Sequence, residues 1–187
     1  MTEVYLLRHA QPASGDFADK DRPLSEKGIS DLPKVTAYFA ERHVDVIYSS
    51  PFVRALKTIE PFAQSYGYPI HIVEDFHEVQ IGTDYSMDFV ELIHQLWCNP
   101  DMHLSDGESY GNVQRRTIAA LKPLLDKHKD QTVVIAMHST AMSRMVNYYD
   151  PDFGWEDYLH LLQFTPYVAK LCFDGQRCTD ITFHDFN

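Results

Sequence analysis

Two histidines that lie far apart in the chain each follow an apolar segment with the character of a buried strand. His9 comes directly after Leu6, Leu7 and Arg8, and His138 follows the run Thr132–Met137. Open α/β sheets bind ligands beyond the carboxyl ends of their strands, so both imidazoles stand where a site is expected. A guanidinium next to a potential imidazole nucleophile suits an oxyanion such as phosphate.

Three further segments carry side chains of the kind that a phosphate site needs. Arg54 lies four residues after Ser50 in the segment Ser-Ser-Pro-Phe-Val-Arg, in the first turn of a predicted helix. Glu78 and Gly82 belong to a polar loop that follows a third predicted strand. Asp-Gly-Glu-Ser at residues 106–109 opens another predicted helix. The sequence therefore offers guanidinium, imidazole and carboxyl groups at the ends of several elements.

Composition limits the partners of this chain. Its 187 residues predict a single domain over 1–187, with a core that needs no disulfides. The 27 acidic and 16 basic residues give a net charge of −11, which excludes nucleic acid and anionic membranes as main partners. Any phosphate site must therefore be a local concentration of arginine and histidine.

The cysteines and the N-terminus predict a cytoplasmic protein. The three cysteines have no metal-type spacing and are typical of a reduced compartment. The first residues carry no basic segment of a secretion signal, and no apolar run reaches the roughly 20 residues that span a bilayer.

Apolar periodicity predicts strands that alternate with helices. The predicted strands are residues 4–7, 44–48, 70–73, 132–137, 168–173 and 178–183. The predicted helices cover about 25–39, 50–66, 86–97, 109–128, 139–149 and 155–162. This alternation indicates an α/β fold, a three-layer α/β/α sandwich with a mostly parallel central sheet.

Local signals refine these elements. Ser25 and Ser50 are expected to cap helices, with Pro51 as a first helical residue. Pro33, Pro61 and Pro123 are expected to kink or interrupt their helices. The last two strands are expected at the edge of the sheet, joined by a turn at Asp-Gly.

The motifs of the chain, and the order in which they occur along it, resemble those of the histidine phosphatase superfamily (phosphoglycerate mutase-like), in its compact bacterial-type phosphatase branch. The matching motifs are Arg8-His9-Ala10, Leu24-Ser25-Glu26-Lys27-Gly28, Ser49-Ser50-Pro51 through Arg54 to Thr58, Glu78 with Gly82, Gly107-Glu108-Ser109, and His138 after its strand. They extend from residue 4 to about 145.

The resemblance implies a phosphoglycerate mutase-like fold and a metal-independent phosphatase that hydrolyses phosphate monoesters through a phosphohistidine. His9 would be the nucleophile, Arg8 and Arg54 would hold phosphate oxygens, and His138, if protonated, would add a third donor. Glu78 would be the general acid and base, with Glu74, Asp75 and Asp84 as alternatives nearby. The expected substrate is a small phosphorylated molecule, and no cofactor or metal is needed.

The chain departs from the family pattern along the pocket wall. Tyr85-Ser86-Met87 replaces the usual Trp-Glu-Gly, Ser139 follows His138 in place of glycine, and Lys57 stands where glutamine is common. Two other functions stay open: a phosphoglycerate-mutase-type phosphotransferase, and a non-catalytic phosphate- or partner-binding module. The short segment after the third strand and Gln11-Pro12 in place of Glu-Ser favour the phosphatase. The sequence predicts neither the natural substrate nor an oligomeric state.

Overall fold

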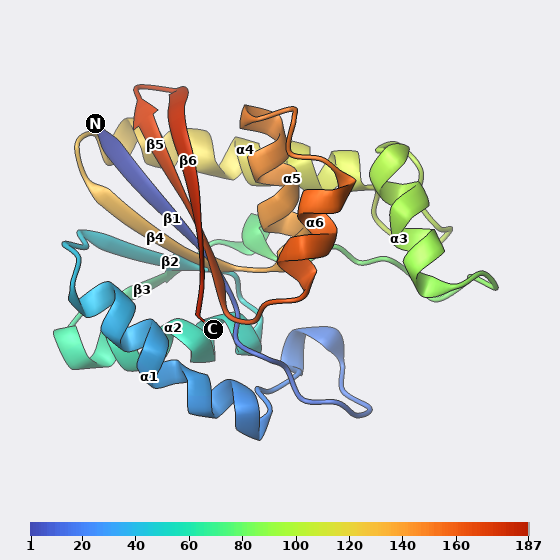
Figure 1. Cartoon of the computed structure of the whole chain (residues 1–187), viewed down its shortest axis with the longest axis horizontal. Helices are drawn as coiled ribbons and strands as arrows, with labels where there is room; N and C mark the ends of the chain where they lie inside the picture. The colour runs from blue at the N-terminus through green and yellow to red at the C-terminus, as the bar shows by residue number, and fades with distance from the viewer. Residues whose placement is uncertain (187) are drawn as a thin grey trace.

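A twisted sheet runs through the computed structural model, which describes residues 1–186, and helices cover both of its faces (Figure 1). The order of the strands across the sheet is β3-β2-β4-β1-β5-β6. Their bounds are β1 Thr2–Arg8, β2 Val46–Ser49, β3 Ile70–Ile72, β4 Thr132–Met137, β5 Tyr167–Asp174 and β6 Arg177–Asp185. Strands β1 to β4 pair in parallel, and β5 and β6 are added in antiparallel pairings, which confirms the mostly parallel sheet.

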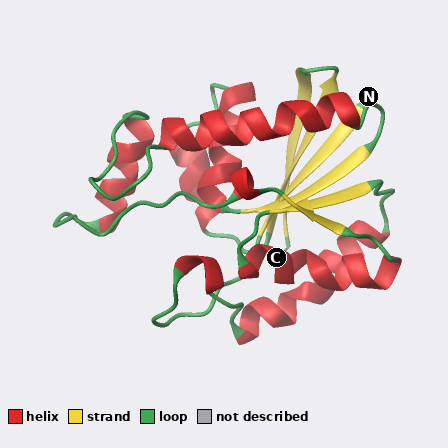
Figure 2. Ribbon diagram, turned by 180° about the vertical axis from the view of Figure 1, so that it is seen from behind, coloured by secondary structure: helices red, strands yellow, loops and turns green. Residues whose placement is uncertain are grey.

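The helices form the two outer layers of the sandwich (Figure 2). Helices α1 (Glu26–Ala40) and α2 (Val53–Tyr66) pack on one face, and α4 (Tyr110–Lys127), α5 (Ser139–Tyr149) and α6 (Trp155–Leu162) pack on the other. Helix α3 (Phe89–Cys98) lies beyond the end of the sheet, beside α6 (Figure 1). The predicted three-layer architecture is confirmed.

Side-chain alternation along β1 explains why this sheet has two cores. Leu6 is fully buried in the cluster formed with α4 and α5, whereas Tyr5 and Leu7 are buried against α1 and α2. Successive residues of a strand point to opposite faces, so one apolar strand can serve both layers. The same alternation in β4, the most apolar strand, confirms its central place between β1 and β2.

Some local expectations are wrong. Pro123 does not interrupt α4, and α1 and α2 likewise continue through Pro33 and Pro61. Each proline removes one intrahelical hydrogen bond, but tertiary burial of the apolar face sustains the helix, as the wholly buried residues after Pro33 in α1 show. Strand β5 is internal, between β1 and β6.

Two helix starts also differ from the expectation. Helix α2 begins at Val53 rather than at Pro51, and Ser50 does not cap it. Helix α3 begins at Phe89, where the Asp88 carboxylate accepts from the amides of the first turn. The Ser25 cap on α1 is confirmed, since its hydroxyl accepts from the Gly28 amide at 3.0 Å.

One contact joins helix α1 to the segment that follows His9. A Cβ on Gly28 would lie 2.2 Å from the backbone oxygen of Gln11, so only glycine allows this approach. Within residues 1–186, no helix has the length and apolar character needed to cross a bilayer.

Candidate active site

The two histidines stand side by side at the carboxyl ends of adjacent parallel strands. Arg8 in β1 is in register with Met137 in β4, and the His9 amide continues the ladder by donating to the Met137 oxygen at 3.1 Å. The imidazole rings of His9 and His138 are 5.3 Å apart between centroids, and both residues are buried. Strand pairing therefore brings together two side chains that are 129 positions apart in sequence, as the strand-end pattern predicted.

His9 is held with one ring nitrogen free of a proton. Its Nδ1 donates to the backbone oxygen of Ala10 at 2.7 Å, and its Nε2 accepts from Arg54 Nε at 3.2 Å. Burial, followed by the charges of Arg54 and Arg8, holds the pKa of His9 well below its ordinary value. A neutral imidazole with an Nε2 lone pair is the form that can act as a nucleophile.

Arg54 reaches His9 from the first turn of α2. The Thr58 hydroxyl donates to the Arg54 carbonyl at 2.7 Å and accepts from the Ala10 amide at 2.9 Å, which ties α2 to the segment after β1. The outer nitrogens of the guanidinium contact Asp19, in the 3-10 helix η1 (Asp19–Asp21). Nη1 donates to its carbonyl and lies 3.2 Å from Oδ1, and Nη2 lies 3.2 Å from Oδ2.

The Arg8 guanidinium has one nitrogen that is anchored by hydrogen bonds and another that has no partner among the described residues. Its Nη1 donates to the backbone oxygens of Leu161 at 2.7 Å and Phe164 at 2.6 Å, at the C-terminal end of α6. Its buried Nε has no partner among the described residues. Burial lowers the pKa of Arg8 to about 10, although the nearby Glu78 carboxylate opposes this decrease. The guanidinium is therefore fixed in place and keeps a donor for another acceptor.

His138 is paired with Ser50, which sequence reasoning assigned to a helix cap. Its Nε2 lies 2.7 Å from the Ser50 hydroxyl, which also accepts from the Phe52 amide at 3.2 Å. The buried Nδ1 of His138 has no partner within residues 1–186. Burial, together with the neighbouring His9 and Arg54, lowers the pKa of His138 well below its ordinary value. A hydroxyl that donates to Nε2 leaves Nδ1 protonated, so a neutral ring can still donate a hydrogen bond.

Glu78 lies against the N-terminus of α5, which begins directly after His138. Its carboxylate accepts from the amides of Thr140 at 3.0 Å and Ala141 at 3.1 Å, from the Ser139 hydroxyl at 3.1 Å and from its neighbour Val79 at 2.9 Å. A helix N-terminus favours an anionic group at this place. The three alternative acids are exposed: Glu74 and Asp75 in η2 (Glu74–Phe76), and Asp84 in the loop beyond it.

Two residues of the polar segment before α1 contribute to the site without belonging to one of the sequence motifs. Asp19 is one of three acidic residues in the polar segment before α1, and only the folded structure shows that it meets Arg54. Arg22 follows η1, and its Nε is buried without a partner among the described residues. Its charge contributes to the low pKa of His9, after burial and the charges of Arg54 and Arg8.

The donor set of this site suits an anion. It consists of guanidinium and imidazole nitrogens, and within residues 1–186 no three His, Cys, Asp or Glu side chains cluster as metal ligands would. A cavity of about 500 Å³ lies on the Glu78 side of the molecule. Its lining residues are His77, Gln80, His103, Gly107, Glu108, Ser109 and Asn112. The lining of this cavity does not include His9, His138 or either arginine of the site, but the Phe52 ring contacts both His77, which lines the cavity, and His138.

Comparison with known proteins gives a consistent result. A family model described as the histidine phosphatase superfamily (branch 1) matches residues 4–184. A curated relative, phosphoserine phosphatase 1 of Hydrogenobacter thermophilus, is 28% identical over 163 residues, which cover 78% of this chain and 74% of the relative.

Solved structures share the fold over nearly the whole chain. YhfR of Bacillus stearothermophilus superimposes with a TM-score of 0.76 at 23% identity and covers 96% of this chain and 95% of its own. A phosphoserine phosphatase of Entamoeba histolytica, in complex with 3-phosphoglyceric acid, gives a TM-score of 0.77 at 22% identity, over 99% of this chain and 98% of its own.

Proposed function

Because the chain belongs to the histidine phosphatase superfamily (branch 1), we propose that it hydrolyses phosphate monoesters through a phosphohistidine intermediate on His9. One observation carries this proposal. The Nδ1 of His9 donates a hydrogen bond to the Ala10 oxygen, so the lone pair on Nε2 faces the Nε–H of Arg54, and the ring lies next to His138. That arrangement pairs a nucleophile with groups that bind phosphate oxygens.

In the first step, Nε2 of His9 attacks phosphorus and the bond from phosphorus to the leaving oxygen breaks. Arg54, Arg8 through its unpaired Nε, and His138 through its unpaired Nδ1 hold the three other oxygens. Glu78 enters this step protonated, carrying the proton that it takes from water in the second step, and gives it to the leaving oxygen, which departs as an alcohol. The unpartnered buried nitrogens of Arg8 and His138 support this assignment, because buried polar atoms are normally hydrogen-bonded.

In the second step, water attacks the phosphorus of phosphohistidine. The Glu78 carboxylate takes a proton from that water, the bond from phosphorus to Nε2 breaks, and its electron pair returns to His9. Inorganic phosphate leaves and the enzyme regains its starting form. Charge on the phosphoryl oxygens changes through both steps, and the fixed donors supply most of the stabilisation without a metal.

The proposed substrate is a small phosphorylated molecule. The curated relative is named a phosphoserine phosphatase, and a structural neighbour was solved with 3-phosphoglyceric acid, so these two compounds are the first to assay. The cavity of about 500 Å³ beside His77 has room for the alcohol part of such a substrate. We also propose a cytoplasmic location, which the free thiols of Cys98, Cys172 and Cys178 support.

The test is release of phosphate from p-nitrophenyl phosphate in the presence of EDTA. Wild-type protein should be active, and His9→Ala should lose about a thousandfold or more of kcat. His43→Ala, which removes an imidazole that is 78% exposed, is the matched control and should keep full activity. Activity that His9→Ala does not lower would overturn the nucleophile, and activity that EDTA abolishes would overturn the metal-independent mechanism.

The intermediate itself can be trapped. Glu78→Gln should form the phosphoryl adduct from p-nitrophenyl phosphate and hydrolyse it slowly, because the variant lacks the base that activates water. An alkaline quench followed by mass spectrometry should then find the adduct on the peptide that contains His9. No adduct in this variant, or an adduct elsewhere, would contradict the proposed path.

A further inference from the structure

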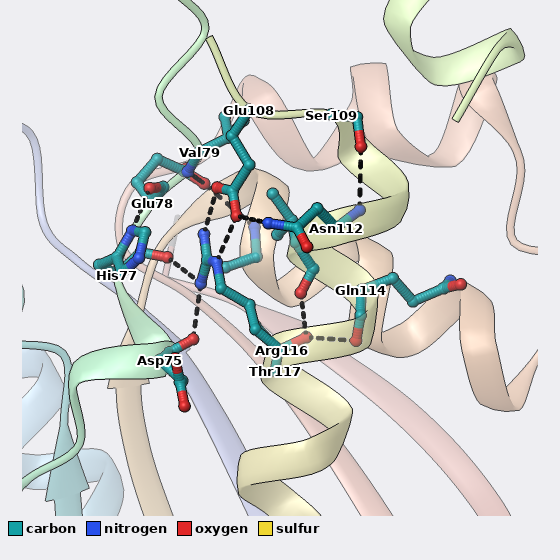
Figure 3. A network of polar contacts seen from close by, with 12 residues as sticks. Asp75, His77, Glu78, Val79, Glu108, Ser109, Asn112, Gln114, Arg116 and Thr117 are labelled. Carbon is teal, nitrogen blue, oxygen red and sulfur yellow. Dashed lines mark hydrogen bonds and ion pairs between the residues drawn. The ribbon is translucent and has the colours of Figure 1, made fainter. Parts of the chain in front are cut away.

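A partly buried ion pair lies next to the segment that carries Glu78. Arg116, in the first half of α4, and Glu108, just before that helix, are joined by two parallel hydrogen bonds, Nε to Oε1 at 2.8 Å and Nη2 to Oε2 at 2.9 Å (Figure 3). Their side chains are only 11% and 14% exposed. This forked geometry fixes the plane of the guanidinium.

The remaining outer nitrogen of Arg116 reaches the segment before Glu78. Nη1 donates to the backbone oxygens of Asp75 at 2.6 Å and His77 at 2.9 Å (Figure 3). The His77 oxygen and the Glu78 amide nitrogen belong to the same planar peptide group. Holding that oxygen therefore orients the backbone on which the Glu78 side chain is mounted.

Glu108 is itself fixed by several contacts. Its Oε1 accepts from the Asn112 side chain at 2.6 Å, and its amide donates to the Gln80 oxygen, two residues beyond Glu78, at 2.6 Å. Burial alone would raise the pKa of Glu108, but the hydrogen bonds and the charge of Arg116 outweigh burial and hold the pKa below its ordinary value. The pair is therefore ionised, and it ties the backbone on both sides of Glu78 to helix α4.

The carboxyl group of Glu78 is attached to a different helix. It accepts from the N-terminus of α5, whereas its backbone is held by α4 through Arg116. The position of the carboxyl group relative to His9 thus depends on both attachments. Arg116 itself makes no hydrogen bond or ion pair with Glu78, His9, His138 or either site arginine in the part of the chain that the structure describes.

We propose that Arg116, paired with Glu108, is a positioning residue that sets where the Glu78 carboxyl group meets the leaving oxygen of the substrate. This inference rests on the proposed role of Glu78 as general acid. Displacement of a general acid affects the departure of a strongly basic leaving group far more than that of a weakly basic one. The role of Arg116 is therefore visible in the dependence of kcat/KM on the leaving group.

The experiment compares two aryl phosphates of similar shape, phenyl phosphate and p-nitrophenyl phosphate, in wild type, Arg116→Met and Glu78→Gln. The value of kcat/KM covers only the steps up to formation of phosphohistidine, so hydrolysis of the intermediate does not obscure the effect. We expect Arg116→Met to lower kcat/KM about 10- to 100-fold for phenyl phosphate and only a few-fold for p-nitrophenyl phosphate. Glu78→Gln should show the same selectivity, and more strongly.

The neighbouring arginine supplies the matched control. Arg115 is 65% exposed and has a longer contact, 3.8 Å to Asp101, so Arg115→Met should match wild type on both substrates. Arg116→Lys keeps the charge but loses the fork, and it should give an intermediate selective loss. If Arg116→Met does not fold, Arg116→Lys decides the question.

The outcomes separate this inference from the proposed function. If Glu78→Gln shows the selective loss but the Arg116 variants lose activity equally on both substrates, or lose none, the positioning role alone is overturned. No selectivity in Glu78→Gln would overturn the general-acid role and the inference with it. Selective loss in both supports the positioning role.

Discussion

Arg54 donates its Nε–H to the Nε2 lone pair of His9 across 3.2 Å, while its other two nitrogens contact Asp19. One guanidinium thus has three acceptors from the protein itself, the His9 imidazole and both the carboxylate and the backbone carbonyl of Asp19. On the proposed path, phosphate oxygens take over these donors when His9 attacks phosphorus.

Arg54→Lys should lower kcat/KM for p-nitrophenyl phosphate about 10²- to 10³-fold, the usual cost of losing a donor to the transferring group. An ammonium group cannot offer the forked donors that bind two oxygens at once. Steady-state kinetics measure the effect, with Arg177→Lys, which changes a 78% exposed arginine, as the control. Equal activity of the two variants would contradict a role for Arg54 at the phosphate.

Asp19→Asn should make inorganic phosphate a tighter competitive inhibitor, by about two- to fivefold, because a partly exposed ion pair is worth up to about 1 kcal/mol. The reason is competition, since the Asp19 carboxylate and a phosphate oxygen bind the same guanidinium. Asp21→Asn, which changes an exposed acid of the same 3-10 helix, is the control for net charge. Weaker inhibition by phosphate in Asp19→Asn would show instead that Asp19 holds Arg54 ready for substrate.

The imidazole of His9 should stay neutral at pH 6.5, where an ordinary histidine is half protonated. Burial, Arg54 and Arg8 lower its pKa well below that value, so protonation requires a more acidic solution. The measurement is an NMR titration of the imidazole nitrogens in phosphate-free buffer, with His9→Asn to assign the signals. A titration midpoint near pH 6.5 would refute the prediction.

The free energy of unfolding should decrease as the pH falls below about 6.5. His9 and His138 both have folded-state pKa values below their unfolded values, so the unfolded chain binds more protons there. Below pH 6.5 each contributes a slope of at most about 1.4 kcal/mol per pH unit, whereas their stabilisation is fully present above pH 6.5 and is lost on acidification. Urea unfolding at several pH values measures the slope of the free energy of unfolding against pH. His138→Asn should reduce this slope by the contribution of about one bound proton, and an unchanged slope would contradict this account.

The parts of the site that lie on regular structure could be predicted from the sequence. His9 and His138 each follow an apolar run, and parallel pairing of β1 with β4 brings such strand ends together. Arg54 follows a strand end in the first turn of a helix, which places it at the same edge of the sheet. These predictions succeeded because the periodicity of a strand or helix fixes the direction of its side chains.

The parts that depend on contacts between loops and distant elements could not be predicted. Ser50 resembled a helix cap, but its hydroxyl bonds to His138, 88 positions away. Glu108 belongs to a segment that predicts only the start of a helix, whereas it forms a forked pair with Arg116. Asp19 stood among other acidic residues of a polar segment. In each case the sequence shows the type of the residue, but its partner depends on tertiary packing, which a local sequence pattern does not predict.

The hydrogen bond from the His9 amide to the Met137 oxygen has a wider consequence. It makes the spacing of the two imidazoles a property of the ladder between neighbouring strands, which is among the stiffest dimensions of a protein. Insertions or replacements in the surrounding loops can therefore alter which molecules are admitted without changing the distance between the two rings. Laboratory evolution of new substrate preferences should then accumulate its changes in the segments around Asp19 and His77, and leave the two strand tips alone.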